Sequence, residues 1–408
     1  LFQMMGAFFA LFSSSPENIA LMVNYMSVFS SAFSVLFLFW TLTLLMKKLP
    51  IFQSLDNIYE RLTFFGSAAV GALAFCFSDS FWFNAVEAEV YAMATFILSL
   101  LFWLGLRWEQ DMNTPRGDRW LLLISFIIGL SFGVHFMGLL TIPAIGMIYY
   151  FRNNPKVTVK SFLLANLISV AILLFIFKLL LPTTLAFFGN SEVFFVNKMG
   201  LPFNSGTIIA GLCFILFFYY SLRYTQHQKW VNINTSILCI LFVLVGFSSW
   251  LMIPIRANAN TVINENSPSD ARSLLAYYNL EQYPETHLFY GPLFSDMYAG
   301  QDETEPYVDD KPKYERDYKT GKYFIVNHWE RSKINSNSDH RGFLPRLWSS
   351  EHSGNYMNFT GPLEFSIIPE YRNNEMLRSR VDEFREDVQD GLVTGDDYHK
   401  FSEHYPPI

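Results

Sequence analysis

The stretch SDSFWFNAVEAEVYA, Ser78 to Ala92, decides how the rest of the chain is interpreted. It places Asp79, Glu87 and Glu89 between two segments apolar enough to lie in a bilayer, where a carboxylate is costly and usually has a function. Glu87 and Glu89 are two apart, so they share a side on a strand or an irregular turn and diverge on a helix. One interpretation is a solvated loop at the membrane surface. The other is the rim of a cavity, because the stretch carries aromatic residues typical of a membrane interface, namely Phe81, Trp82, Phe83 and Tyr91.

Charge divides the 408-residue chain into two unlike parts. Residues 1–255 hold 10 acidic and 13 basic side chains, whereas residues 256–408 hold 26 acidic and 16 basic ones. The first part is predicted to be a membrane domain and the second a soluble acidic region. The net charge of −7 comes entirely from the second part, which argues against nucleic acid as a partner. The three cysteines all fall in apolar runs and are interpreted as buried apolar residues: Cys76, Cys213 and Cys239.

About nine apolar segments are candidates to cross or enter the hydrocarbon layer, which needs about 20 helical residues per crossing. Several of them are short, so half-crossing or tilted helices are expected. The chain starts at Leu1, already within an apolar run, and is expected to be part of a longer protein that has lost its N-terminal portion. The predicted segments are 1–13, 19–46, 62–77, 90–106, 120–134, 136–151, 161–182, 206–222 and 233–254.

Basic residues predict the orientation of these segments. If the helices alternate, 11 of the 13 basic residues of the first part fall in connections on one side, which the positive-inside rule makes cytoplasmic. These connections contain Lys47, Lys48 and Arg61, then Arg107, Arg116 and Arg119, then Arg152, Lys156 and Lys160, then Arg223 and Lys229. The outer side then receives the turn 78–91, the tip at His135, a loop over 182–205 and everything after Pro254.

The segment from Arg119 to Phe151 has one ionisable group, His135, near its centre. A single tilted helix would bury this imidazole at mid-membrane. Two short helices that meet at GVHFMG, with Gly133 and Gly138 easing the turn, would lift it to the outer face, and this hairpin is the prediction. For His135 itself two roles stay open: a structural hydrogen bond to a neighbouring helix, or contact with an anionic head group.

The membrane part ends in WLMIPIRANANTVINENSPSDARSLLAYYN. Pro254 is expected to stop the helix and Arg256 to emerge at the outer interface. Arg256 either snorkels or offers its planar fork of donors to a phosphate. The residues after it either form turns or bind a sugar by hydrogen bonds: Asn258, Asn260, Asn264, Glu265 and Asn266.

The order of these features resembles the GT-C class of integral membrane glycosyltransferases. The outer turn SDSFWFNAVEAEVYA, the hairpin RWLLLISFIIGLSFGVHFMGLLTIPA and the outer IRANANTVINENSPSDARSLLAYYN are most similar to a largely Bacteroidetes family of membrane proteins formerly of unknown function. An animal relative of that family is a protein O-mannosyltransferase. The resemblance extends over nearly all of residues 1–300 and implies a mainly α, polytopic GT-C-like fold. The residue patterns of the later part add an α+β extracytoplasmic region to this prediction.

The resemblance implies a function as well as a fold. It implies transfer of a sugar, with mannose as one option, from a polyprenyl-phosphate carrier to a hydroxyl, such as Ser or Thr of secreted or envelope proteins, on the outer face of the bacterial inner membrane. His135 and Arg256 are candidates to stabilise the departing lipid phosphate. The family's catalytic acid usually lies in an earlier outer loop, so the principal base is expected before Leu1. Asp79, Glu87, Glu89 and Tyr91 are then candidates to contact the acceptor or to shape the cavity.

Residues 256–408 are punctuated by Pro, Gly, Asn and Asp. The run 323–329, YFIVNHW, predicts a buried strand, and 376–393 predicts an amphipathic helix ended by a Gly-containing turn. The charged run 301–322 lacks the regular spacing of a calcium loop, and the six histidines of this part lack zinc-site spacing. No metal site is therefore assigned, any divalent metal requirement is undetermined, and the part, expected on the periplasmic side, is assigned to contact with an acceptor or partner protein.

Two other functions stay open. A non-catalytic membrane subunit that scaffolds an envelope or secretion complex would explain a missing catalytic loop. A transporter would need ionisable groups near mid-membrane and often an internal repeat. Only Lys178 and His135 qualify as such groups, and the sequence shows no repeat.

Overall fold

A computed structural model describes residues 1–259, 261–283, 287–299, 301–302, 304–361, 363, 372–394, 397–398 and 400–401. The chain divides into two compact units, Leu1–Asn279 and Leu280–Ile408. The boundary expected at 255/256 therefore lies inside the first unit. The reason is α13, Ala271–Tyr278, whose Leu274 and Leu275 are buried in the same core as Leu185 of α9. We call Leu1–Asn279 the helical unit.

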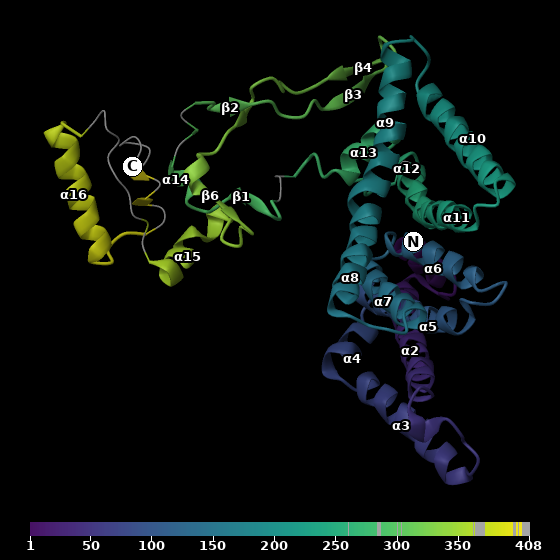
Figure 1. Ribbon diagram of the computed structural model, residues 1–408. Coiled ribbons are helices and arrows are strands. Elements are labelled where there is room, and N and C mark those ends of the chain that lie inside the picture. The colour runs from purple at the N-terminus through teal and green to yellow at the C-terminus, as the bar shows by residue number, and fades with distance from the viewer. Residues whose placement is uncertain are drawn as a thin grey trace. The chain divides into compact units, whose positions relative to one another are not determined.

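The helical unit consists of α-helices and short 3-10 and π segments (Figure 1). Among its described residues, five helices are long and apolar enough to cross a membrane, and a sixth crossing arises if the bent pair of α3 and α4 counts as one. The chain is thus a multi-pass membrane protein, and the predicted polytopic helical fold is confirmed. The helices are α1 Phe2–Ala10, α2 Ile19–Met46, α3 Ile58–Cys76, α4 Asp79–Ala85, α5 Val90–Asp111, α6 Asp118–Ser131, α7 Thr141–Asn153, α8 Val159–Leu174, α9 Leu181–Asn197, α10 Ser205–His227, α11 Val231–Phe247, α12 Met252–Ala257 and α13.

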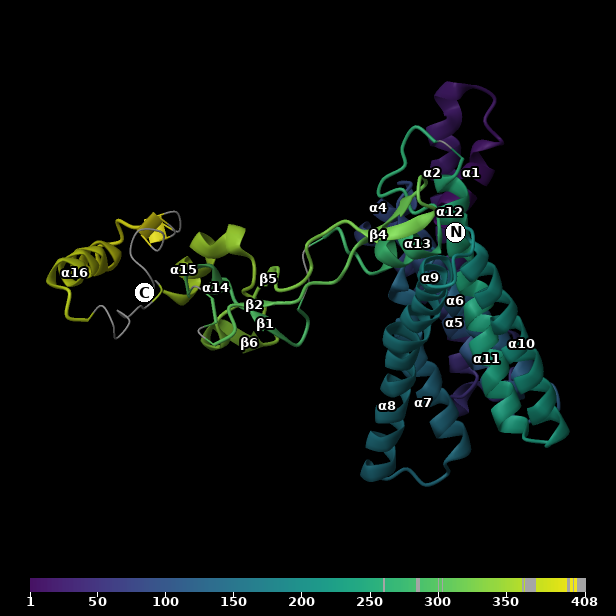
Figure 2. The same ribbon diagram turned by 90° about the horizontal axis from the view of Figure 1, so that it is seen from above.

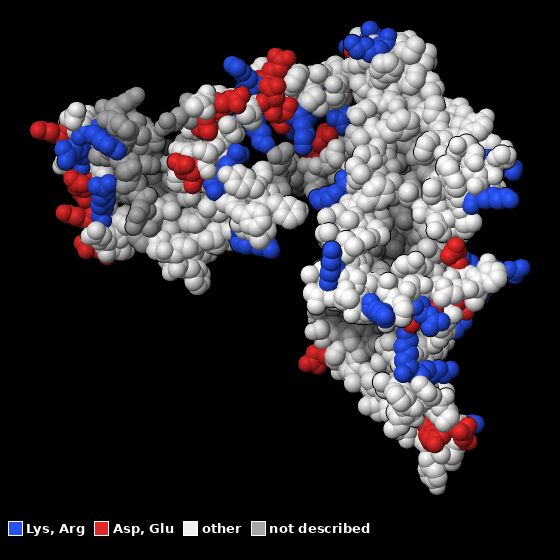
Figure 3. All heavy atoms as spheres, viewed as in Figure 1, with Lys and Arg blue, Asp and Glu red and all other residues white. Residues whose placement is uncertain are grey.

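The outer faces of these helices are apolar, as lipid contact requires. On α10, Ile208, Leu212 and Ile215 follow helical spacing and are 64, 57 and 66% exposed. In the space-filling view, charged side chains are sparse over most of the visible face of the helical unit (Figure 3). An apolar face that no protein covers is stable only in hydrocarbon, so the burial pattern and the hydropathy agree.

Small residues bring the helices close together. Four serines of α2, Ser27, Ser30, Ser31 and Ser34, recur at helical spacing and are buried, and α2 lies along α5. The closest approach joins α6 to α11: a Cβ on Gly129 would lie 2.0 Å from the carbonyl oxygen of Val243, and one on Gly246 would lie 2.2 Å from that of Phe126. Such contacts between backbones are how helices associate in lipid, where apolar side chains gain little by leaving the solvent.

The segment around His135 is a hairpin, as predicted. Helix α6 ends at Ser131, a turn follows, a 3-10 segment runs over Phe136–Leu140, and α7 begins at Thr141. Helix α7 lies on α5, where Trp108 stacks on Tyr149 at a centroid distance of 5.6 Å. Gly138 is needed at the tip, because a Cβ there would lie 2.8 Å from the side chain of Ser131.

The structure corrects the expected outer loop over 182–205. The helix does not stop at Pro182 but passes from α8 through a π-helical segment, η4, Phe175–Leu180, into α9, which ends at Asn197. Pro182 lacks an N–H for the carbonyl of residue 178 and its ring would clash with it, and the wider π turn relieves both problems. The hydroxyl of Thr184 donates to the carbonyl of Leu180 at 2.7 Å.

The continuous helix bends where α8 passes into α9. Helix α9 is seen at its full length in Figure 1, whereas α8 is seen at its full length only in the view turned by 90° (Figure 2). Both a proline and a π turn lie at this point, and these are the two commonest causes of a sharp bend in a helix.

The second unit is α+β. Its described residues form three antiparallel pairs of short strands: β1 Tyr290–Pro292 with β6 Arg341–Phe343, β2 Tyr307–Val308 with β5 Lys333–Ile334, and β3 Tyr314–Asp317 with β4 Lys322–Ile325. Its described helices are α14 Asp296–Ala299, α15 Ser353–Thr360 and α16 Glu375–Gln389.

Two predictions for the second unit have different outcomes. The predicted helix over 376–393 is confirmed as α16, with Gly391 at a φ of 70° after its end. The predicted strand over 323–329 exists as β4, but it is not buried: Tyr323 is 5% exposed, whereas Phe324 and Ile325 are 47 and 41% exposed. Because the sheet of β3 and β4 has only two strands, it buries a single side chain of β4 rather than the whole apolar run.

Candidate functional site

His135 lies in the turn of the hairpin. Its Nδ1 accepts a hydrogen bond from the backbone N–H of Met137 at 3.2 Å, and its own backbone N–H donates to the carbonyl of Ser131 at 2.8 Å. Its ring stacks on Phe136 at 4.5 Å and lies 5.8 Å from the ring of Tyr91 on α5. The imidazole is half-buried, so the structural role left open for it is met by a local cap rather than by a bond to another helix.

Segments far apart in the sequence meet at this turn. The indole N–H of Trp250, in the 3-10 segment η5 Ser248–Leu251, donates to the carbonyl of Phe132 at 2.9 Å, and the N–H of Phe2 donates to that of Gly133 at 3.0 Å. A Cβ on Gly133 would lie 2.8 Å from the hydroxyl of Ser249. We call this region the His135 end of the helical unit. It comprises the hairpin turn, the starts of α1 and α5, and the adjoining segments α4, η4, η5 and α12.

The three carboxylates of the first motif lie beside the start of α5. Helices α3 and α4 meet at a bend of 69°, and aromatic pairs fix it, with Phe81 on Phe75 at 4.3 Å. Asp79 opens α4, while Glu87 and Glu89 lie in the non-helical turn before α5, as the irregular-turn interpretation expects. None of the three carboxylates makes a hydrogen bond or ion pair with a described residue. The structure thus brings Tyr91 to His135 but joins no carboxylate to it.

Arg256 lies in the last turn of α12 and is exposed. Its guanidinium makes no hydrogen bond or ion pair within the described part of the chain. The amide of Asn258 donates to the carbonyls of Pro254 and Ser269 at 2.8 and 2.7 Å, and that of Asn264 donates to the carbonyl of Ala257 at 3.0 Å. These two asparagines close the loop after α12, as the turn interpretation expects.

The remaining candidate residues of this motif are Asn260, Glu265 and Asn266. Glu265 and Asn266 are exposed, and Asn266 has a φ of 58°, in the left-handed region that asparagine tolerates. Asn260 lies outside the described residues. No described contact joins any residue of the motif to His135.

Two ionisable residues of the helical unit stand apart from the sequence motifs. Glu192 of α9 is fully buried, and its carboxylate accepts hydrogen bonds from the N–H groups of Asn204 and Thr207 and from the Thr207 hydroxyl. It therefore caps the start of α10, where the helix dipole favours a negative charge. Lys178 of η4 is exposed, and its Nζ lies 5.0 Å from the ring centre of Phe177. In the sequence, each of these two residues could have been singled out as a lone charge in a long apolar run.

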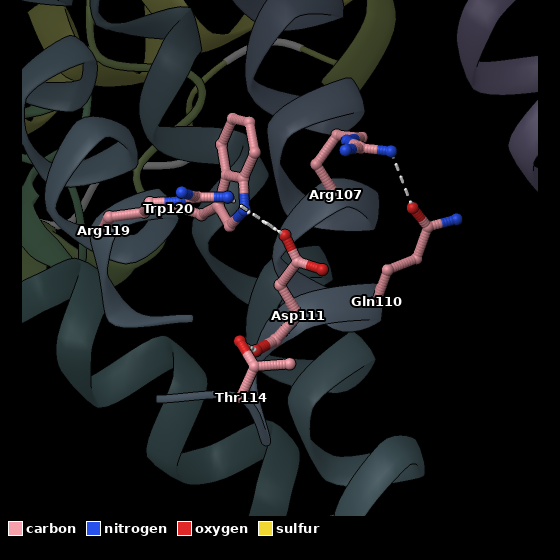
Figure 4. Close-up of polar contacts among 6 residues, drawn as sticks. All are labelled: Arg107, Gln110, Asp111, Thr114, Arg119 and Trp120. Carbon is pink, nitrogen blue, oxygen red and sulfur yellow. Dashed lines mark hydrogen bonds and ion pairs between the residues drawn. The ribbon is translucent and has the colours of Figure 1, made fainter. Parts of the chain in front are cut away.

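The opposite end of the helical unit holds paired charges, and we call it the basic end. Where α5 ends and α6 begins, the carboxylate of Asp111 accepts from the indole N–H of Trp120 at 2.7 Å and lies 3.6 Å from Arg119 (Figure 4). Arg107 donates to Gln110 at 2.9 Å. Further contacts join Lys48 to Glu109 and the hydroxyl of Thr235 to Asp118. The predicted basic connections 47–61 and 107–119 therefore lie at one end.

A separate open groove of about 950 Å³ lies on α10 near its last turns. It holds none of the predicted site residues. It is lined by Tyr220, Ser221, Arg223, Tyr224, Gln226 and His227. All six belong to one helix, so the groove is a surface feature rather than an enclosed site.

The second unit has a polar cluster of its own. The hydroxyl of Ser295 and Nδ1 of His340 lie 3.0 Å apart. Burial raises the pKa of the adjacent Asp296 carboxyl above its ordinary value, while His340 and Arg341 act in the opposite direction. The cluster holds β6 against the start of α14, so a structural role accounts for it.

Residues 1–158 match the model of the protein O-mannosyl-transferase TMEM260 N-terminal domain. Residues 284–378 match a family of unknown function, DUF8416. No curated protein and no solved structure gives a match. The first match supports a relation of this part of the chain to the animal protein O-mannosyltransferase, and it indicates a glycosyltransferase. It covers both the motif 78–92 and the His135 turn.

Proposed function

We propose that the protein is a GT-C-type glycosyltransferase that moves a sugar from a polyprenyl-phosphate carrier to the hydroxyl of a Ser or Thr in a secreted or envelope protein. The observation that carries the proposal is the match of residues 1–158 to a protein O-mannosyltransferase domain. Mannose is the sugar that this description suggests. The membrane is the bacterial inner membrane, with the basic end in the cytoplasm and the His135 end and second unit on the outer side.

The chemistry is assigned to the His135 end because Glu87, Glu89 and Arg256 make no hydrogen bond or ion pair with a described residue, and the fold uses only Nδ1 of His135. Transfer leaves a negative charge on the lipid phosphate, and a guanidinium or imidazole stabilises such a charge. Arg256 and His135 are the groups assigned to this role. Glu87 and Glu89 are assigned to the acceptor, whose hydroxyl a carboxylate orients by accepting its hydrogen.

The test is transfer of mannose from a polyprenyl-phosphate donor to a Ser/Thr peptide by the intact gene product in proteoliposomes. We expect Arg256→Ala to lower transfer by about tenfold to a hundredfold, as for the loss of a hydrogen bond to a charged group. Arg223→Ala, on α10, is the matched control and should leave transfer unchanged. Full activity of the Arg256 variant would remove the phosphate-binding role. Absence of transfer by the unsubstituted chain with every prenyl-phosphate sugar tried would contradict the function itself.

A further inference from the structure

The position of Lys178 along its helix places it at a membrane boundary rather than at mid-membrane. From Val159 to Leu180, α8 and η4 form a continuous helix of 22 residues, which at about 1.5 Å per residue spans about 33 Å. This length matches the hydrocarbon layer of about 30 Å. Lys156 and Lys160 lie at the start of this crossing, so Lys178 lies at its far end, just before the bend into α9.

Ring contacts place Lys178 at the same level as His135 independently of that length. The Nζ of Lys178 lies 5.0 Å from the ring centre of Phe177. The ring of Phe177 lies 6.2 Å from that of Phe136, which in turn stacks on His135 at 4.5 Å. A cation and an imidazole, 43 positions apart in the sequence, are therefore joined through two aromatic rings on one side of the helical unit.

Neither the ammonium of Lys178 nor Nε2 of His135 has a hydrogen-bond or ion-pair partner among the described residues. No described carboxylate pairs with Lys178, although an ionisable residue in an apolar helix usually has such a partner. His135 uses Nδ1 to accept from Met137, so in the neutral ring Nε2 carries the hydrogen and is free to donate. Snorkelling alone would explain a lysine at this depth, but it does not explain why an imidazole with a free donor is linked to it through Phe177 and Phe136.

We propose that Lys178 and His135 together bind the phosphate of an anionic lipid at the His135 end. Lys178 supplies a mobile point charge, and His135 supplies a fixed hydrogen-bond donor. The exposed ring of Phe136 and the half-buried ring of Phe177 lie against the first carbons of the lipid. Two lipids carry this chemistry at a membrane boundary: a polyprenyl phosphate and an ordinary phospholipid. The choice of the first rests on the proposed function.

Binding to the full chain in nanodiscs tests this site directly, with farnesyl phosphate, phosphatidylglycerol and inorganic phosphate as separate probes. Lys178→Gln is expected to weaken farnesyl phosphate binding about tenfold, the loss of one charge-assisted contact. Lys178→Arg, which keeps the charge, is expected to bind within about threefold of the unsubstituted chain, and it shows that the helix is intact. Lys160→Gln, at the other end of the same helix, is the matched control.

The outcomes show which lipid binds, and they test the site independently of the proposed function. A tenfold loss for farnesyl phosphate alone supports the site and its donor lipid, and an equal loss for phosphatidylglycerol supports a general phospholipid site. Equal affinities of Lys178→Gln and the unsubstituted chain for both lipids would overturn the proposal. Binding is measured without sugar transfer, so the site can stand if transfer is never detected and can fail if transfer is robust.

Discussion

The two ends of the helical unit use charge in opposite ways. At the basic end, Asp111, Glu109 and Asp118 each contact a basic or polar side chain of another segment. At the His135 end, the side chains of five ionisable residues make no hydrogen bond or ion pair with a described residue: Asp79, Glu87, Glu89, Lys178 and Arg256. The first set holds connections together, and the second set is free for a ligand.

The difference shows which ionisable residues stabilise the fold and which are available for function. A carboxylate or guanidinium near hydrocarbon costs free energy unless water, a counter-charge or a ligand compensates it. The basic end provides such partners within the fold. The His135 end instead has charges of both signs on segments next to a turn that is held by hydrogen bonds from Phe2 and Trp250. Substitutions should therefore change stability at one end and activity at the other.

The largest effect is expected at the contact between α6 and α11, because these two helices extend to both ends of the helical unit. Gly246→Ala would place a Cβ 2.2 Å from a backbone oxygen of α6, and the overpacking should lower the free energy of unfolding by about 3 kcal/mol. Transfer should fall with it, because α6 and α11 carry both ends. Thermal unfolding in detergent measures this. Gly66→Ala, with no atom within 4 Å of the new Cβ, is the control and should stabilise α3 by about 0.5–1 kcal/mol.

An intermediate effect is expected at the basic end. Trp120→Phe keeps an aromatic ring but removes the 2.7 Å hydrogen bond to Asp111. The free energy of unfolding should fall by about 1.5–3 kcal/mol, typical for a bond to a charged acceptor, while transfer by the folded fraction stays the same. A fall in transfer per folded molecule would mean that this end also takes part in function.

The smallest effect on stability is expected at the His135 end. Glu89→Gln removes a charge that has no partner in the described part of the chain, so the free energy of unfolding should change by less than about 0.5 kcal/mol. Transfer should nevertheless fall about tenfold, since a charged hydrogen bond to the acceptor is lost. A large drop in melting temperature with intact transfer would reverse the comparison between the ends.

Much of the fold was predictable from hydropathy, because each crossing must satisfy its own backbone and so appears as a continuous apolar run. The hairpin at His135 was predictable from one ionisable group between two glycines. The continuation of the helix past Pro182 was not, because it depends on a π turn that no local pattern announces. The place of α13 in the helical unit was also not predictable, because the sequence of an eight-residue helix does not indicate that it packs on α9.

The candidate site was predictable residue by residue but not as an arrangement. The motifs 78–92, 133–138 and 254–266 gave the ionisable side chains, and the pairing of Tyr91 with His135 needed the packing of α5 on the hairpin. Asn258 and Asn264 proved to use amide hydrogens for the loop after α12, which sequence cannot separate from sugar binding. Lys178 was considered only as a mid-membrane group, because its depth depends on where its helix bends.

The burial of Glu192 links two neighbouring helices. Its carboxylate in α9 accepts hydrogen bonds from the backbone N–H groups at 204 and 207, at the start of α10. Replacing this carboxylate by an apolar group would take an acceptor from these N–H groups. The two helices are therefore expected to lose stability together rather than one at a time.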